Sequence, residues 1–126
     1  MPFPLEQLLS RFVFNSDHVR LDRTLHHRLF KPRRGDALSL YDVDDLNRDR
    51  VCAHGHRYAD DPVKGRIHCG YGELRYEAIK VHGLETKYDN SPPRHVSVFL
   101  PEEDERRLEL AKAIAAKSKF RGCNVN

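Results

Sequence analysis

The sequence has no tryptophan, a single methionine and no long apolar run, although 39% of its 126 residues are hydrophobic. A membrane-spanning helix needs about 18 or more consecutive apolar residues, so we expect no membrane contact. The beginning of the chain lacks the basic start and long apolar stretch of a secretory signal, and we predict a cytoplasmic protein. Three cysteines are an odd number, which argues against a disulfide framework and predicts reduced thiols.

Common catalytic motifs are missing as well. The chain contains no Gly-x-Ser-x-Gly nucleophile elbow, no phosphate-binding P-loop and no His-Glu-x-x-His zinc helix. We therefore favour a role without catalysis. If the chain is an enzyme, its histidines and basic residues favour a phosphodiester or a nucleotide as the substrate.

Hydropathy patterns alternate between the periods of helices and strands along the chain. Apolar spacing predicts helices over residues 5–13, 45–59 and 74–81, and a fourth helix that begins at Pro101. Alternation and short apolar runs predict strands over residues 37–43, 65–69, 84–88 and 94–100. For the first segment, a strand that begins at Arg11 is the alternative.

This interleaving predicts a single compact α+β domain, or a small α/β domain, in which about four strands are covered by three or four helices. We assign residues 1–126 to this domain, because a chain of this length can bury a usable core. Within it we expect an extended basic segment at about 18–36 and a short flexible tail at 120–126.

Positive charge is concentrated near the beginning of the chain. The formal net charge is +3, but residues 11–34 hold seven Arg and Lys against two Asp, a local net of +5. Clustered cations with an interleaved aromatic residue suit phosphates and bases, so this segment predicts a nucleic-acid-binding or phosphate-binding surface. The predicted contact residues are Arg20, Arg23, Arg28, Phe30, Lys31, Arg33 and Arg34. In the alternative interpretation the basic side chains only cover the surface, and in either case we expect Leu29 and Phe30 to lie on the core.

Potential metal ligands are concentrated between residues 52 and 69. On the predicted helix, Cys52 and His56 are four residues apart and share a face, whereas on the predicted strand His68 and Cys69 point to opposite faces. The candidate zinc ligands are therefore Cys52, His56, His68 and Cys69, of which this geometry brings three together. In the alternative interpretation the cysteines are small buried residues and the histidines lie on the surface.

A pair of glycines, Gly70 and Gly72, stands between the strand predicted at 65–69 and the helix predicted at 74–81. Backbone N–H groups at such a helix start hold phosphate, and Arg75 adds a cation. We therefore include Gly70, Gly72 and Arg75 among the predicted phosphate-binding residues. A plain tight turn is the alternative, because glycine is the default residue of such turns.

His95-Val-Ser97-Val, on the strand predicted at 94–100, resembles one half of the signature of two-histidine phosphoesterases. In that family two His-x-Ser/Thr-x segments lie on facing strands. The candidate for the second segment is His18-Val-Arg20-Leu, which has Arg20 in place of the hydroxyl residue. The resemblance implies that His18 and His95 act as general base and acid on a phosphodiester, with basic residues binding the phosphate.

Together these features predict a small accessory domain that binds a phosphate-bearing partner, with nucleic acid (RNA or DNA) as the favoured class, within a larger assembly. One alternative is a small histidine-dependent enzyme acting on a phosphodiester or a nucleotide, with or without zinc. A further alternative is a protein–protein adaptor without catalysis. Zinc is the one candidate cofactor.

Overall fold

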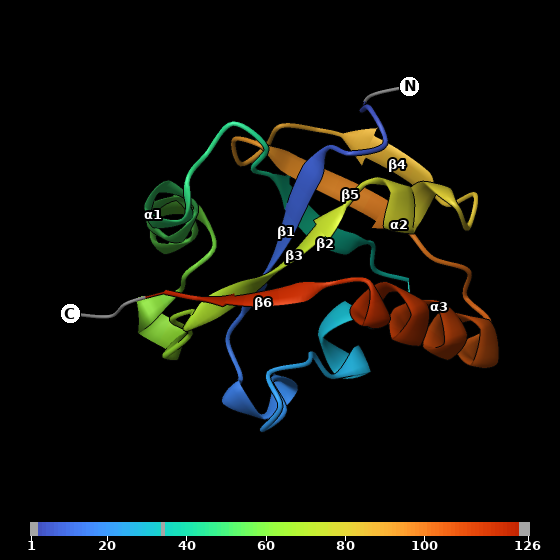
Figure 1. Cartoon of the computed structure of the whole chain (residues 1–126), viewed down its shortest axis with the longest axis horizontal. Helices are drawn as coiled ribbons and strands as arrows, with labels where there is room; N and C mark the ends of the chain where they lie inside the picture. Colours follow the sequence, from blue (N-terminus) through green and yellow to red (C-terminus); the bar gives the residue numbers. More distant parts are fainter. Residues whose placement is uncertain (1–2, 34, 124–126) are drawn as a thin grey trace.

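The computed structural model describes residues 3–33 and 35–123, which form a mixed α+β domain around one six-stranded antiparallel sheet (Figure 1). The predicted α+β class is confirmed, but the predicted number of about four strands is wrong. The sheet has the strand order β4-β5-β2-β1-β3-β6. Its strands are β1 (Leu8–Val13), β2 (Leu38–Asp42), β3 (Gly70–Arg75), β4 (Glu85–Tyr88), β5 (His95–Phe99) and β6 (Lys119–Gly122). The helices are α1 (Arg48–Tyr58), α2 (Glu77–Lys80) and α3 (Asp104–Ala116), with 3-10 turns η1 (Ser16–His18), η2 (His27–Phe30) and η3 (Pro62–Lys64).

Helices cover both faces of the sheet and create two apolar clusters (Figure 1). The larger cluster joins the sheet to α3, α2 and η2, with Leu110 and Ile114 of α3 fully buried. The smaller cluster joins the other face to α1, through Val51 and Cys52. The smaller cluster also holds the chemically most notable group of side chains.

Strand β1 occupies the segment for which we predicted an amphipathic helix, so that prediction is wrong. Leu9 and Val13 face the larger cluster, whereas Leu8 and Phe12 face the smaller one. A strand that is apolar on both faces loses the two-residue alternation of a half-buried strand. Its paired apolar residues then repeat at three- and four-residue spacing, which imitates a helix.

Strand β3 shows that the strand predicted at 65–69 and the turn predicted at 70–72 are both wrong. Residues 70–72 were expected to be a turn after a strand at 65–69, but the strand itself begins at Gly70. It pairs with β1 on one side and with β6 on the other. A side chain at Gly72 would lie 2.7 Å from Leu25 and 3.3 Å from Phe30, so glycine here lets the basic segment pack onto the sheet.

The end of the chain also differs from its prediction. Lys119–Gly122 form β6, which pairs with β3, where a flexible tail from residue 120 was expected. The last part of that tail, residues 124–126, lies outside the described residues, as does Arg34.

The remaining elements agree with the patterns that predicted them. Helix α1 lies within the predicted 45–59 and begins at Asn47, whose side chain accepts a hydrogen bond from the Arg50 N–H. Strands β2, β4 and β5 and helix α3 lie within or close to their predicted ranges. Gly83 ends the α2 region in the left-handed conformation (φ 67°), as expected of a C-cap. In the described part of the chain, no helix has the length and apolar character needed to cross a membrane.

Candidate functional site

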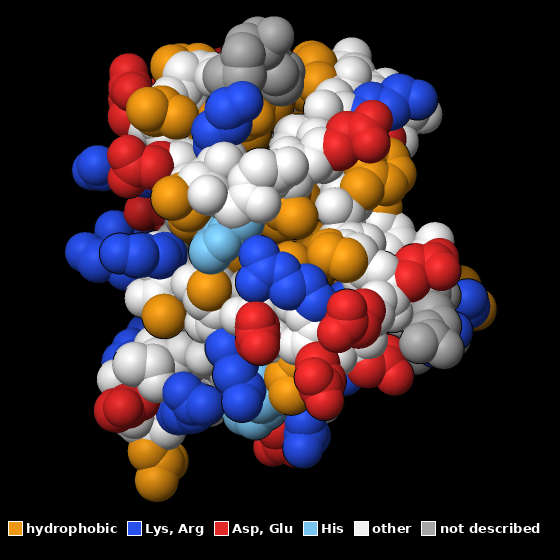
Figure 2. All heavy atoms as spheres, turned by 90° about the vertical axis from the view of Figure 1, so that its right-hand side faces the viewer, with side chains coloured by type: hydrophobic (Ala, Val, Ile, Leu, Met, Phe, Trp, Pro, Cys, Tyr) orange, Lys and Arg blue, Asp and Glu red, His pale blue; other side chains and the backbone are white. Residues whose placement is uncertain are grey.

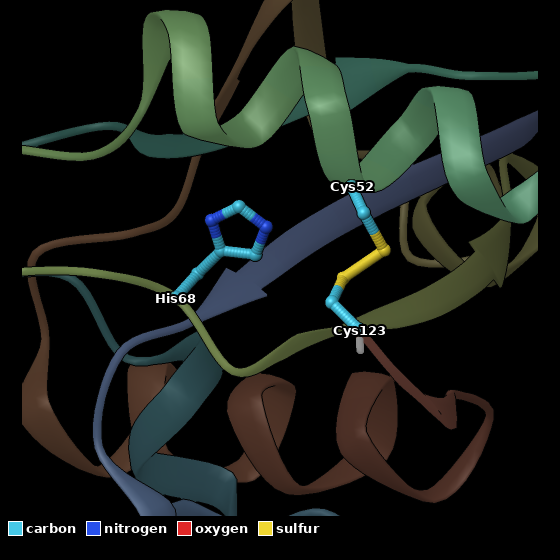
Figure 3. Close-up of side chains that lie close together, drawn as sticks. All are labelled: Cys52, His68 and Cys123. Atoms are coloured by element: carbon cyan, nitrogen blue, oxygen red, sulfur yellow. A yellow bond between two sulfur atoms is a disulfide. The ribbon is translucent and has the colours of Figure 1, made fainter. Parts of the chain in front are cut away.

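A disulfide between Cys52 and Cys123 joins α1 to the end of β6 (Figure 3). The two residues are 71 positions apart in the sequence, and each is 9% exposed. The prediction of reduced thiols is therefore wrong for this pair, and only Cys69 is a free thiol among the described residues. Disulfides are typical of oxidising environments. Cytoplasmic localisation thus stays a prediction.

His68 lies beside this disulfide and is completely buried. Its Nδ1 lies 2.6 Å from Oδ1 of Asp60, and the same oxygen accepts the His68 backbone N–H at 3.0 Å. Nε2, the other ring nitrogen, has no hydrogen-bond partner among the described residues. Figure 3 shows the ring lying between the chain of His68 and the two sulfur atoms.

Helix α1 reaches this position because of Gly55. A Cβ at Gly55 would lie 2.5 Å from His68 Cε1 and 2.5 Å from Phe12 Cε1. Glycine therefore lets the helix backbone rest directly on the two rings, at a modest cost in helix propensity. Phe12 and Phe14 complete the aromatic wall, with centroids 4.8 and 6.3 Å from that of His68.

His56 forms the exposed side of the same centre. Its Nδ1 lies 2.6 Å from the second carboxylate oxygen of Asp60, and its ring centroid is 4.2 Å from that of His68. Asp60 thus bridges two imidazoles with its two oxygens. Two sets of potential metal ligands share His68. The first set is Cys52, His68 and Cys123, and the second is His56, Asp60 and His68. Within each set the ligand atoms all lie within 4.8 Å of one another.

Of the four predicted zinc ligands, His68 belongs to both sets, Cys52 only to the first, His56 only to the second, and Cys69 to neither. Cys69 directs its thiol to the Val13 carbonyl at 3.5 Å and belongs to neither set. Sequence reasoning missed Cys123 and Asp60. The i,i+4 spacing of His56 and Asp60 was a signal that pointed to Asp60, because such residues share a helix face. Nothing in the sequence pointed to Cys123.

Electrostatics fix the proton positions in this centre. Burial lowers the pKa of His68, although the hydrogen bond and the charge of Asp60 act in the opposite direction. The backbone carbonyl of Cys52 also lies near the ring and acts to raise the pKa, although its geometry with Nε2 is not that of a hydrogen bond. Burial would raise the pKa of Asp60, but hydrogen bonds from His68 and His56 outweigh it and lower the pKa. At neutral pH this combination gives an ionised Asp60 and a neutral His68 with its proton on Nδ1. The lone pair of Nε2 is then free to accept a proton or a metal ion.

Solvent reaches the centre from one side. A small hollow of about 190 Å³ opens beside Cys52. Its lining residues are Arg48, Asp49, Cys52, Ala53, His56 and Gly122. The disulfide is therefore covered but not sealed.

The predicted basic segment forms a second candidate site, at the lower end of the molecule in Figure 1 around η1 and η2. Its exposed cations are Arg20, Arg23, Arg28, Lys31 and Arg33. Figure 2 shows Lys and Arg side chains gathered around a histidine near this end. Phe30 is fully buried, as expected of a core residue, so the structure contradicts its predicted role in stacking on a base.

Three histidines lie among these cations. His18, His26 and His27 are half-buried, and the rings of His26 and His27 are 4.2 Å apart. Desolvation, followed by the positive charges of neighbours, lowers the pKa of each of the three. Arg28 acts on all three histidines, Arg20 on the latter two, and Lys112 of α3 on His27. We call the group of His18, Arg20, His26, His27, Arg28, Lys31, Arg33 and Lys112 the basic surface.

Two inward-pointing arginines hold the backbone beneath the basic surface. Arg11 donates to the carbonyls of Leu29 and Ser39, both at 3.0 Å. Burial lowers the pKa of Arg11 to about 10, which still leaves it charged at neutral pH. Arg107, 2% exposed, donates to the carbonyls of Pro32 at 3.0 Å and Arg33 at 2.7 Å. The basic segment is thus anchored although it contains little regular structure.

The predicted phosphate site at Gly70, Gly72 and Arg75 has a different geometry from the one expected. Both glycines lie inside β3 between two neighbouring strands, so no helix begins at a turn there. Arg75 instead lines a groove of about 910 Å³ near α2, α3 and β6. The groove also exposes Leu5 and Val81 (Figure 2 views this side of the molecule).

The two histidines of the phosphoesterase resemblance lie in different surroundings. His18 ends η1, which is not a strand, and its charged neighbours are His26, Arg28, Arg11 and Asp17. His95 lies on β5, where its Nδ1 is 2.6 Å from Asp89 and its ring packs against Tyr41. Ser97 donates to the same Asp89 at 2.9 Å. No described interaction joins His18 to His95.

Comparison with known proteins adds no assignment: no family model matches the chain, and no curated protein or solved structure is significantly similar to it. Function must therefore be argued from the two candidate sites, the disulfide centre and the basic surface.

Proposed function

We propose that the basic surface binds a phosphate-bearing partner, with nucleic acid as the favoured class, and that the protein is an accessory domain of a larger assembly. One observation carries the proposal: Arg20, Arg28, Lys31 and Arg33 are exposed on one short segment that also holds three histidines. The pKa values of these histidines are lowered first by burial and then by neighbouring positive charges. Such a field of positive charge attracts polyanions.

The availability of the cations supports the same conclusion. Among the described residues, the side chains of Arg20, Arg28, Lys31 and Arg33 form no hydrogen bond or ion pair with one another or with a carboxylate. Arg23 differs, because its guanidinium lies 5.1 Å from the centroid of the Phe120 ring. Because Arg107 and Arg11 fix the backbone, binding would order mainly side chains, which limits its entropic cost.

Salt dependence is the first test. Affinity for a fluorescent single-stranded RNA or DNA should fall steeply with salt, because binding to phosphates releases counterions. Replacing Arg20, Arg28, Lys31 and Arg33 with Ala should remove most of the binding. The slope of log K against log salt should become shallower by about 0.7 for each phosphate of a single strand that the variant no longer neutralises.

A matched control removes the same charge elsewhere. Arg50, Lys64, Lys80 and Lys87 are exposed and lie outside the basic surface, so their combined replacement with Ala should leave most of the affinity and slope intact. An equal loss of affinity in the two variants would mean that only the net charge of the protein, and not the basic surface, determines binding. Binding that does not respond to salt would contradict the proposal.

Proton linkage gives an independent signature. A bound phosphate favours the charged form of His18, His26 and His27 and so raises their lowered pKa values. Binding should then take up protons, and the affinity should increase from pH 7.5 to pH 5.5 at constant ionic strength. Replacing His26 and His27 with Asn should weaken this pH dependence.

The enzymatic alternative now depends on the Asp89–His95 pair, in which the carboxylate orients the imidazole as in a general base. It requires turnover of a phosphodiester or a cyclic nucleotide that His95→Ala abolishes while nucleic-acid affinity is preserved. Absence of turnover by the intact protein would remove this alternative. A protein adaptor would instead co-elute with its partner on size exclusion and show no response to the basic-surface variant.

A further inference from the structure

The disulfide centre has an unused polar atom that points to a ligand. His68 Nε2 is buried and has no hydrogen-bond partner among the described residues. A ring nitrogen of His68 and the sulfur atoms of Cys52 and Cys123 all lie within 4.8 Å of one another, and the ring lies beside the disulfide (Figure 3). A buried acceptor is expected to be paired, so an unpaired one aimed at two sulfurs requires an explanation.

The protonation state of the imidazole follows from geometry. Asp60 Oδ1 lies 2.6 Å from Nδ1 and is a hydrogen-bond acceptor when ionised, so the ring proton belongs on Nδ1. Nε2 therefore presents its lone pair to the sulfurs. A histidine whose other nitrogen donates to a carboxylate is the usual arrangement of a metal-binding imidazole, because the carboxylate fixes the tautomer and the ring orientation.

We propose that reduction of the Cys52–Cys123 disulfide converts this centre into a zinc site formed by Cys52 Sγ, Cys123 Sγ and His68 Nε2, with water as the fourth ligand. The protein would then exist in an oxidised, cross-linked form and a reduced, metal-binding form. This inference is independent of the proposed function, because none of these residues belongs to the basic surface.

Two balanced steps connect the two forms. A dithiol reductant transfers two electrons and two protons, so that the S–S bond breaks, two S–H bonds form and the reductant itself becomes a disulfide. Zn²⁺ then displaces the two thiol protons into solvent, and no electron moves in this second step. Two thiolates and one neutral imidazole balance the charge of the ion.

The spacing of the backbone suits both forms. The Cα atoms of Cys52 and Cys123 are 5.7 Å apart. Zinc–sulfur bonds of about 2.3 Å in a tetrahedron place two sulfurs about 3.8 Å apart, a span that rotation of the two cysteine side chains can reach. The hollow of about 190 Å³ lies beside Cys52, and we propose that reductant and metal approach from there.

Cys69 provides an internal control. It follows His68 directly in the sequence, but its thiol contacts the Val13 carbonyl and lies outside the ligand set. Removal of this cysteine should therefore leave the metal site intact. If zinc bound to reduced thiols in general, and not specifically to Cys52 and Cys123, removal of Cys69 would lower the zinc content as well.

The test compares the oxidised and reduced forms of the 126-residue chain. Each form is equilibrated with Zn²⁺ under anaerobic conditions, desalted and analysed for metal. We expect one zinc per reduced chain and none per oxidised chain. With Co²⁺ as the probe, the reduced form should show thiolate-to-cobalt charge transfer and the visible absorption of a tetrahedral site. Equal zinc uptake by the oxidised and reduced forms would overturn the proposal. No zinc uptake by the reduced form would overturn it as well, and His68 Nε2 would then serve only as a hydrogen-bond acceptor for a cysteine thiol.

Variants assign the ligands. Cys123→Ser and His68→Gln should each weaken zinc binding at least about a hundredfold, and Asp60→Asn about 10- to 100-fold as an outer-shell change. Cys69→Ser should bind like the reduced wild type. Loss of binding in Cys69→Ser, or full binding in Cys123→Ser, would exclude this ligand set.

A footprint on the wild-type protein covers the case in which the variants do not fold. Zinc should slow alkylation of reduced Cys52 and Cys123 at least about tenfold and leave Cys69 unaffected, as read by mass spectrometry of peptides. Protection of all three cysteines, or of none, would contradict the assignment.

Discussion

Gly55 allows α1 to lie against His68 and Phe12, and its replacement tests how tightly this contact is made. Gly55→Ala should destabilise the protein, although alanine is the better helix former by about 1 kcal/mol. The new Cβ would meet two rings at 2.5 Å, and overpacking of this kind costs about 1–3 kcal/mol. The urea midpoint of unfolding, compared with that of the wild type, shows whether the substitution stabilises or destabilises the protein.

Ala53 supplies the control for Gly55, because it lies on the exposed side of the same helix. Ala53→Gly should cost only the propensity difference of about 1 kcal/mol. If Gly55→Ala were more stable than the wild type, α1 would not be in close contact with His68.

Single residues also mark the limit of what the sequence could predict about the disulfide centre. Cys52 and His56 were recognisable because residues four apart on a helix share a face. Cys123 was not, because a partner 71 residues away becomes adjacent only when the sheet order is known. Cys69 was a candidate because a strand was predicted at 65–69, whereas β3 begins only at Gly70 and the Cys69 thiol faces Val13.

At the scale of elements, Arg107 connects α3 to the basic segment. Its guanidinium donates to the carbonyls of Pro101, Pro32 and Arg33 at 2.7–3.0 Å. Arg107→Ala leaves these carbonyls without their donor, and we expect a loss of stability of about 3 kcal/mol or more. The amide protons of residues 33, 35 and 36 should also exchange faster, because the segment loses its anchor.

Arg106 is the matched control for Arg107. It is exposed, and its side chain pairs only with Glu109 at 3.2 Å among the described residues. Arg106→Ala should therefore change the stability by less than about 1 kcal/mol. Comparable losses in the two variants would mean that helix charge, and not the anchoring of carbonyls, explains the effect.

The difference between predicted and observed elements has a common physical origin. Helix α3, which buries one face, kept the periodicity that identified it, and β2 kept the alternation of Leu38 and Leu40 although Tyr41 is buried on its other face. Strands β1 and β3 are packed on both faces or carry glycines for close packing, and their patterns imitated a helix and a turn. Local sequence therefore failed at the two strands whose patterns are not those of a half-buried strand, β1 and β3.

For the whole molecule, the α+β class followed from the interleaving of patterns, but the centre that links α1 to β6 required the complete topology. The same topology places His68 against the smaller cluster, beside Phe12, and His18, His26 and His27 on the basic surface. The histidines with lowered pKa values are His18, His26, His27, His54 and His68, in each case with burial as the largest cause.

These shifts determine how stability depends on pH. A histidine whose folded pKa is lower than its unfolded value of about 6.5 binds fewer protons when folded. Well above pH 6.5 neither the folded nor the unfolded chain binds this proton, and the histidine does not affect the free energy of unfolding. As the pH falls from about 6.5 through the folded pKa, mainly the unfolded chain binds the proton, and the free energy of unfolding decreases. Asp60 and Asp89 have lowered pKa values as well, but their contributions are lost only below about pH 4, outside this window.

We therefore predict that the protein with its disulfide intact becomes less stable from pH 7.5 to pH 5. Urea midpoints at constant ionic strength should decrease steadily over this range, because only the unfolded chain takes up the additional protons. Replacing both His26 and His27 with Asn should make the decrease shallower without removing it, since His68 remains buried and neutral. A midpoint that is constant or rises towards pH 5 would show that the histidines are charged in the folded protein, which is incompatible with a neutral, buried His68 beside the disulfide.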